Sequence, residues 1–514
     1  MDKLVAKTQY FNRRLAVACS VIAVSTFNYG FDNQAFATTQ AMAPFARQFG
    51  KYNASTGEYA LPASWLSLFG SLNYIGFGVG VMVGSFVSAR WGRRMCMFVM
   101  SIYALATATV CVTSMHRDQI MAARILNYIY VGMELSVIPN YQAEIVPAPV
   151  RGLIVGSYQL SLILGGLVIN SICLRTSTLT SNQAWRIPLG LFYIVPSIIA
   201  ASVWFLPESP RWLLQKGRVD EARENLHKFR VGTLYSEEAI EDELRDIQDQ
   251  LRREADKGSY VELFSRNNIK RTAIVIGINF FQQATGQQFG SQYGAIYVKQ
   301  LGTINPFHFT IISSSIAFIT ICFSLLMTDH IGRRKLLLFS ICLMGTAMMT
   351  MGGLGTIKDM HKDVKIAIVS MLSLATVSFS TGLGPLCYVV STEIPALRLR
   401  DMTLRTGFVV NVVFNFVSNF IIPYCLDAIG SKTGFIFGSV CILGIAFIYF
   451  CVPDCTGKTL EQVDLMFQRG VPIRKFGSYV FEDIDTDSHN DDQVYGKSGV
   501  SEPTVVSNNK ESSV

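Results

Sequence analysis

The sequence contains little charge for its size: charged residues make up 16% of its 514 residues, whereas half of the residues are hydrophobic. A soluble chain of this length needs about 25% charged residues to cover its surface. A bilayer accounts for the deficit, because lipid-facing side chains can be apolar on every side. The composition therefore argues against an ordinary soluble protein and predicts an integral membrane protein whose surroundings are the lipid bilayer.

The sequence also lacks the groupings of cysteine and histidine that bind metals or form disulfide frameworks. Its eleven cysteines lie mostly inside apolar segments without CxxC spacing, which is typical of small core residues. The six histidines lie outside the apolar segments or near their ends and form no ligand cluster. The net charge of +7 is scattered between apolar blocks. We therefore predict no enzyme, no metal, no cofactor and no nucleic-acid partner.

The charge that is present separates apolar segments long enough to cross a membrane. Each can span a hydrocarbon core of about 30 Å at 1.5 Å per residue. We predict twelve transmembrane helices, at residues 15–36, 64–88, 95–115, 119–143, 153–174, 185–206, 272–298, 307–328, 335–355, 365–390, 405–427 and 433–453. An even number of spans places both termini on one side of the membrane.

Basic residues are concentrated in the short loops on the side of the N-terminus. They are Arg13, Arg14, Arg90, Arg93, Arg94, Arg333, Arg334, Lys335, Arg398 and Arg400. The opposite loops are poorer in them, with Lys358, Lys362 and Lys365 as exceptions. This bias predicts that both termini are cytoplasmic. The loop at 37–63 is then extracellular, and its Asn53-Ala54-Ser55 is a candidate glycosylation site.

Polar stretches divide the chain into parts. We expect a cytoplasmic N-terminus at 1–14, a six-helix half at 15–206, a cytoplasmic linker at 207–271, a second half at 272–453 and a cytoplasmic tail at 454–514. In the linker, 220–229 and 237–254 have helical spacing with little apolar content, which predicts short amphipathic helices. The tail has too few large apolar residues for a core and is predicted to be largely disordered. It either only solubilises the chain or carries modifications that control trafficking.

Three short motifs recur in the same order in both halves. The pairs are Gly92-Arg93-Arg94 with Gly332-Arg333-Arg334, Glu144 and Arg151 with Glu393 and Arg400, and Pro207-Glu208 with Pro453-Asp454. Each member follows an even-numbered span. The repeats predict two parallel, pseudo-symmetric halves, an arrangement that places a substrate site between them near the midplane.

The recurring loop residues carry opposite charges at the cytoplasmic ends of the two halves. Exposed ion pairs are worth about 0–1 kcal/mol each, but a network of them can bias an equilibrium between conformations. We therefore predict that a cytoplasmic gate is formed by Arg93, Arg94, Glu144, Arg151, Glu208, Arg211, Asp329, Arg333, Arg334, Glu393 and Arg400.

Several of these motifs resemble those of sugar porters of the major facilitator superfamily. Residues 207–213 (PESPRWL) resemble the signature after span six, 282–286 (QQATG) the span-seven motif, 329–335 (DHIGRRK) the second-half loop motif and 453–461 the end signature. The resemblance covers residues 15–465 and is greatest to fungal members. It implies the major facilitator fold, sugar transport, a monomeric functional unit and a place in the plasma membrane.

Amide side chains within the spans are candidates for binding sugar hydroxyls, because they donate and accept without the cost of a buried charge. They are Gln159, Gln282, Gln283, Gln288, Asn411 and Asn415. The resemblance implies sugar contact at positions 159, 282, 283 and 411, although intramembrane amides also bind helices together. Gln288 and Tyr388 stand where the family has Asn and Trp. Hexose, pentose and disaccharide substrates therefore remain open.

Asp32 lies in the first span, where a buried carboxylate costs several kcal/mol unless it is paired or protonated. Its expected partner is Arg124 in span four. The resemblance implies that Asp at this position marks proton symporters, since protonation that releases Arg124 can couple to sugar binding. Asp32 at a water-filled end of the span is the alternative. We predict sugar:proton symport, with facilitative uniport and a transporter-like nutrient sensor as the other readings.

Overall fold

A computed structural model of the protein describes residues 9–54, 57–233, 235–254, 259–266, 268–357, 361–456, 458 and 460–479. Residues 1–477 form one compact unit, and the contacts reported below lie within it. The predicted disordered tail falls largely outside the described residues. The described part is helical except for loops and a hairpin of strands β1 (Lys51–Asn53) and β2 (Glu58–Ala60).

The six predicted spans of the first half are all helical. They correspond to α2 (Arg13–Thr39), α4 with α5 (Ala63–Ser71, Asn73–Trp91), α6 (Arg93–Val112), α7 (Arg117–Ile145), α8 (Ala148–Thr176), and α9 with α10 (Gln183–Gly190, Ile194–Ser202). Short 3-10 turns, η1 (Leu191–Tyr193) and η2 (Val203–Phe205), continue the sixth span. A short helix, α3 (Ala43–Phe49), lies in the loop after α2.

The second half repeats this pattern with more interruptions. Its helices are α14 (Ile269–Ala284), α15 (Gln287–Gln292), α16 (Gly294–Leu301), α17 (Pro306–Ile331), α18 (Arg333–Leu354), α19 (Lys362–Ser378), α20 (Gly384–Glu393), α21 (Arg400–Ile429) and α22 (Thr433–Cys451). Ten stretches of described residues are long and apolar enough to cross a membrane, and the last of them, Arg400–Cys451, contains both α21 and α22.

The seventh span is broken, which corrects the prediction of a continuous helix over 272–298. Gly286 has a φ of +83°, a left-handed conformation that glycine adopts readily. A side chain there would also collide with the Phe437 ring, whose Cγ lies 2.4 Å from an ideal Cβ position. The break separates α14 from α15. Amides on both sides of it, Gln283 and Gln288, hydrogen-bond to α21. Span ten contains a π-helical turn, η4 (Phe379–Leu383), just before Gly384-Pro385.

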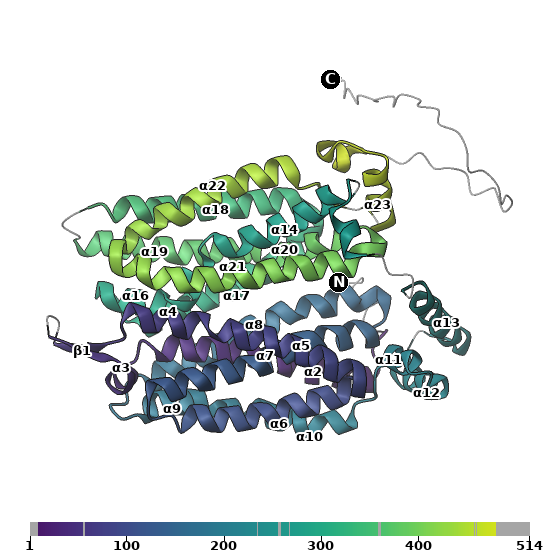
Figure 1. Ribbon diagram of the computed structural model, residues 1–514, viewed down its shortest axis with the longest axis horizontal. Coiled ribbons are helices and arrows are strands. Elements are labelled where there is room, and N and C mark those ends of the chain that lie inside the picture. Colours follow the sequence, from purple (N-terminus) through teal and green to yellow (C-terminus); the bar gives the residue numbers. More distant parts are fainter. Residues whose placement is uncertain are drawn as a thin grey trace. The chain divides into compact units, whose positions relative to one another are not determined.

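The polar linker contains α11 (Pro210–Gln215), α12 (Val219–Arg230) and α13 (Glu237–Glu254), which confirms the two predicted amphipathic helices. Their apolar faces pack together in a cluster formed by Trp212, Leu213, Ala222, Leu226, Ile240 and Leu244. Figure 1 shows these helices at the same end of the bundle as α23 (Leu460–Gln468). We call this the terminal end, and the end with β1 and α3 the loop end.

Close packing of α2 against α8 depends on two glycines. An ideal Cβ on Gly30 would lie 1.8 Å from the Leu162 carbonyl oxygen, and one on Gly165 would lie 2.0 Å from the Phe27 carbonyl oxygen. Small residues allow such backbone approach between membrane helices. The contact fixes α2, and with it the residues around Asp32.

The two halves are hydrogen-bonded to each other at the loop end. The bonds that join the halves there are Ser67 to Phe420, Tyr293 to Leu66, Gln292 to Asn33, Asn170 to Ser314 and Lys299 to Ala41. The loop end is therefore the closed end in this conformation.

Candidate substrate and proton sites

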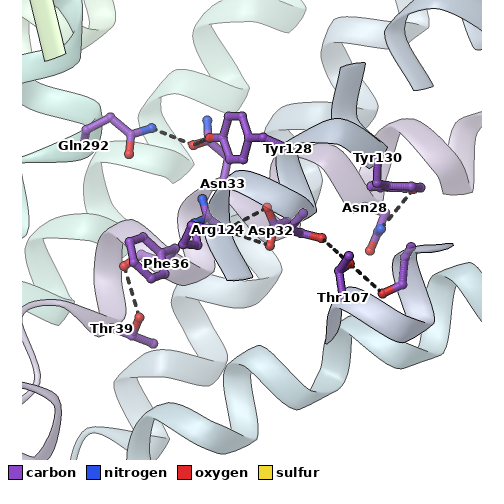
Figure 2. Close-up of polar contacts among 12 residues, drawn as sticks. Asn28, Asp32, Asn33, Phe36, Thr39, Thr107, Arg124, Tyr128, Tyr130 and Gln292 are labelled. Carbon is purple, nitrogen blue, oxygen red and sulfur yellow. Dashed lines mark hydrogen bonds and ion pairs between the residues drawn. The ribbon is translucent and has the colours of Figure 1, made fainter. Parts of the chain in front are cut away.

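Asp32 and Arg124 form a buried ion pair between α2 and α7 (Figure 2). Arg124 Nη1 donates to both carboxylate oxygens of Asp32, at 3.1 and 3.0 Å. The two side chains are 3% and 6% exposed. The guanidinium carbon lies 4.1 Å from the centre of the Phe36 ring and 4.9 Å from that of Tyr128. Asp32 is therefore buried in this structure, in contrast to the alternative in which it lies at a water-filled end of the first span.

Because the ion pair is buried, each of its two charges is stabilised mainly by the other. Removing one partner of a buried ion pair typically costs 3–5 kcal/mol, because the remaining charge is left uncompensated. Protonation of Asp32 removes its charge without removing the side chain. The group is therefore placed to change the interactions of Arg124 when it gains a proton.

Asn33, the neighbour of Asp32, connects this pair to the second half. Its Oδ1 accepts hydrogen bonds from the Tyr128 hydroxyl at 3.1 Å and from Gln292 Nε2 on α15 at 2.8 Å (Figure 2). Sequence reasoning missed Asn33 and Gln292. Their position inside apolar spans was visible, but which helices meet was not.

The second half contains a cluster of hydrogen-bonded amides. Asn411 Oδ1 accepts from Gln283 Nε2 at 3.1 Å, and Asn411 Nδ2 donates to Gln282 Oε1 at 2.5 Å. Gln282 Nε2 donates to the Gly384 carbonyl at 3.1 Å. A fourth amide, Asn279, accepts from Asn411 at 3.3 Å. It was missed because it lies outside the QQATG motif.

The amide cluster continues along α15 and α21. Gln288 Nε2 donates to Asn415 Oδ1 at 2.9 Å, and Asn419 Nδ2 donates to the same oxygen at 2.7 Å. The structure therefore brings together five of the six predicted amides: Gln282, Gln283, Gln288, Asn411 and Asn415.

Tyr388 on α20 joins this network through a side-chain hydrogen bond with Gln282, whereas Gln159 lies outside it. Tyr388 is 44% exposed, and its ring centre lies 6.4 Å from that of Phe408. Gln159 lies on α8 in the first half and is half-buried. In the part of the chain that the structure describes, Gln159 is not hydrogen-bonded to the amide cluster, so the two halves supply separate polar groups.

At the terminal end of the first half, Arg93 and Glu144 form a bidentate pair with N–O distances of 2.9 and 2.6 Å. Glu208 accepts from the backbone N–H groups of Arg93 and Arg94 at 3.0 and 3.1 Å, where α6 begins. A carboxylate at a helix N-terminus is favourable. Burial raises the pKa of Glu208 above its usual value, and the N–H donors of Ser209, Arg94 and Arg93 oppose that rise.

The second half repeats this cluster. Arg333 pairs with Glu393 at 3.3 Å, and the Arg333 N–H donates to the Thr456 hydroxyl oxygen, which in turn donates to Asp454. Arg94 and Arg334 also match: they donate to the Trp204 and Tyr449 carbonyls.

The Arg93–Glu144 and Arg333–Glu393 ion pairs of the predicted gate therefore each lie within one half. Arg211 and Arg400 lie at the N-terminal ends of α11 and α21. The side chains of Arg151, Asp329 and the predicted glycosylation residue Asn53 lie outside the described residues.

A bundle of membrane-crossing helices in two repeated halves, with a buried ion pair in the first half and an amide cluster in the second, is the architecture of a membrane transporter. Residues 18–467 match the family model described as "Sugar (and other) transporter", and the chain belongs to that family. The predicted membership of the sugar porters and the twelve-helix major facilitator fold are thereby confirmed. The family is one of transporters and not of enzymes.

Individual relatives are more distant. The chain is 27% identical over 503 residues to the low-affinity glucose transporter HXT3 of Saccharomyces cerevisiae, covering 94% of this chain and 88% of the relative. It is 28% identical over 465 residues to the high glucose sensor RGT2 of the same yeast, covering 87% of this chain but 60% of that protein. The inward-open structure of the xylose transporter XylE from E. coli matches with a TM-score of 0.71 at 21% identity, covering 88% of this chain and 99% of that chain.

Proposed function

We propose that this sugar transporter is a sugar:proton symporter that works by alternating access. The observation that carries the proposal is the buried Asp32–Arg124 pair, held at 3.0–3.1 Å next to a hydrogen bond that joins the two halves. Asp32 is the proton-binding group and Arg124 its partner. When Asp32 gains a proton, the attraction to Arg124 is lost and the guanidinium reorients.

The position of Asn33 explains how this change reaches the other half. Asn33 follows Asp32 on α2 and accepts from Gln292 on α15 at 2.8 Å. Movement of α2 around Asp32 therefore acts on the closed loop end. If sugar and proton favour the same conformation, each increases the affinity for the other by the same factor.

The substrate is a sugar of the hexose, pentose or disaccharide class. The amides of Gln282, Gln283, Gln288, Asn411 and Asn415 supply donors and acceptors for its hydroxyls, with Gln159 and Tyr388 on the facing helices. The amides are bonded to one another, so sugar hydroxyls exchange for these bonds at little net cost. A similar yeast protein is named a glucose transporter and a similar bacterial structure is that of a xylose transporter, which supports this class of substrate.

The charged clusters at the terminal end act as the gate of that side. In the conformation described, each cluster holds the ends of its own half together. We place the terminal end in the cytoplasm and the protein in the plasma membrane as a monomeric unit. The basic loops described in the sequence support this orientation.

The test is uptake of radiolabelled sugar into proteoliposomes with an imposed inward proton gradient, for wild type and Asp32→Asn. The panel contains glucose, xylose, maltose, lactose and cellobiose. Symport predicts accumulation above equilibrium that Asp32→Asn abolishes while sugar exchange survives. Equilibration without accumulation, unchanged by the substitution, would instead make the protein a facilitator. Sugar binding without flux of any sugar would favour a sensor.

A further inference from the structure

A second carboxyl group lies buried in the first half. Glu134 on α7 is 1% exposed. Its Oε1 accepts from the Ser25 hydroxyl on α2 at 3.2 Å, and its Oε2 has no hydrogen-bond partner among the described residues. Sequence reasoning passed over this residue, although an ionisable side chain within an apolar span is itself a signal of function.

Glu134 differs from Asp32 in lacking a cation. Arg124 is bound to Asp32 and lies ten residues before Glu134 on the same helix, about 15 Å away along the axis. Among the described residues, Glu134 forms no ion pair. A buried carboxylate without a counter-ion is far less favourable than the neutral acid. In this conformation the side chain is therefore the protonated acid.

The groups that surround Glu134 are polar but uncharged, apart from Asp32. From α2 they are Ser25, Tyr29 and Asp32, from α7 Tyr130 and from α8 Tyr158. Tyr130 accepts from Asn28 Nδ2 at 3.2 Å (Figure 2). Asn28 Oδ1 and the Tyr158 hydroxyl, like Glu134 Oε2, are buried without a partner among the described residues. Three such atoms on α2, α7 and α8 make this a polar site that the sugar cluster of the second half does not include.

Along α2, the polar site around Glu134 lies between Asp32 and the terminal end. Ser25, which contacts Glu134, precedes Asp32 on α2 by seven residues, or about 10 Å along the helix toward the N-terminus. The halves are hydrogen-bonded at the opposite, loop end. Of the two buried carboxyls, Glu134 is therefore the one farther from the loop end, where the halves are hydrogen-bonded to each other.

We propose that Glu134 is a second proton-carrying residue of the transport cycle, which passes the proton from the Asp32 region to the terminal end. On release, the O–H bond of the carboxyl breaks, its electron pair stays on the carboxylate and the proton passes to water at that end. This inference rests on the proposed symport. It assigns proton release to Glu134 and leaves proton entry to Asp32.

The experiment compares full-length wild type with Glu134→Gln and Glu134→Asp in proteoliposomes, using the sugar that the wild type accumulates. Glu134→Gln is expected to reduce gradient-driven accumulation at least tenfold while sugar exchange without a gradient stays within threefold. Glu134→Asp restores part of the accumulation because it keeps a carboxyl. Glu238→Gln, on the exposed surface of α13, is the matched control and leaves both unchanged.

Infrared difference spectroscopy between acid and alkaline pH supplies a readout that a structural role would not move. The C=O band of a protonated carboxyl is expected to weaken in Glu134→Gln and to persist in Asp32→Asn. Undiminished accumulation by Glu134→Gln, equal loss of exchange and accumulation, or an unchanged band would overturn the inference while symport by the wild type stands. A wild type that never accumulates sugar overturns the proposed symport and this inference together.

Discussion

Gln292 on α15 donates a hydrogen bond of 2.8 Å to Asn33 on α2, and so joins the second half of the transporter to the residue that follows Asp32. Tyr128, whose ring faces Arg124, donates to the same oxygen. One acceptor thus connects the ion pair with the closed loop end. A change at Asp32 and the opening of the loop end are therefore expected to be coupled.

We expect Gln292→Ala to open the loop end more often. Loss of one hydrogen bond worth about 1 kcal/mol shifts the equilibrium roughly fivefold. Hydrogen exchange followed by mass spectrometry measures this as faster exchange of the segment around residues 36–41. The control is Gln287→Ala, which removes a half-buried amide of the same helix. Equal exchange in Gln292→Ala and wild type would show that the bond does not hold this end closed.

The amide cluster predicts a graded loss of sugar transport. Asn411→Ala leaves Gln282 and Gln283 without a shared partner and removes a polar group of the proposed sugar site. We expect kcat/KM for sugar to fall at least tenfold, or about 1.4 kcal/mol or more. Asn140→Ala, an exposed amide on α7, is the control and should change it less than twofold. A similar loss in both variants would mean that the cluster only stabilises the fold.

The ion pair of the first-half cluster predicts a difference in stability. Arg93 and Glu144 are only 11% and 10% exposed, so Glu144→Gln is expected to destabilise the protein by about 1.5–3 kcal/mol. The exposed pair Arg218–Glu221, at 49% and 52%, is the comparison, and Glu221→Gln should cost about 0–1 kcal/mol. Thermal unfolding in detergent measures both. Equal midpoints for the two variants would contradict the ranking.

Packing of α2 against α8 predicts a strict requirement for glycine. In Gly30→Ala the new methyl group would meet the Leu162 carbonyl oxygen, which lies 1.8 Å from its ideal position. The helices must separate, which costs about 1–3 kcal/mol or more and displaces Asp32. Gly78→Ala has open space around the new atom and is the control. A Gly30→Ala protein with wild-type thermal stability and transport would show that α2 and α8 need not approach so closely.

The fold could be predicted from the sequence because the membrane imposes a simple rule. Apolar length determined the spans, and the Arg93 and Arg333 motifs showed that they form two repeats. The break at Gly286 escaped prediction because a helix tolerates glycine, and only the Phe437 ring against it shows why the chain turns there. Local hydropathy contains no information about such a contact.

The site was only partly predictable for a related reason. Asp32 and Arg124 could be paired from the sequence because they carry opposite charges within apolar spans, and a buried charge needs a partner. Glu134 contacts the Ser25 hydroxyl but forms no ion pair within the part of the chain that the structure describes, so a search for charge pairs could not find it. Arg93 and Glu144 were expected to help close one half on the other, and in this conformation they join the ends of α6 and α7 within the first half. Charge shows that two residues can pair, but not which helices bring them together.

The most direct test of proton coupling uses a sugar gradient, in place of a proton gradient, as the driving force. Liposomes containing the protein and a trapped pH dye receive an inward sugar gradient with no imposed pH difference. Coupling through Asp32 predicts that sugar entry acidifies the lumen in wild type, and that Asp32→Asn takes up or exchanges sugar without a pH change. Sugar entry into wild-type liposomes at constant internal pH would contradict the account.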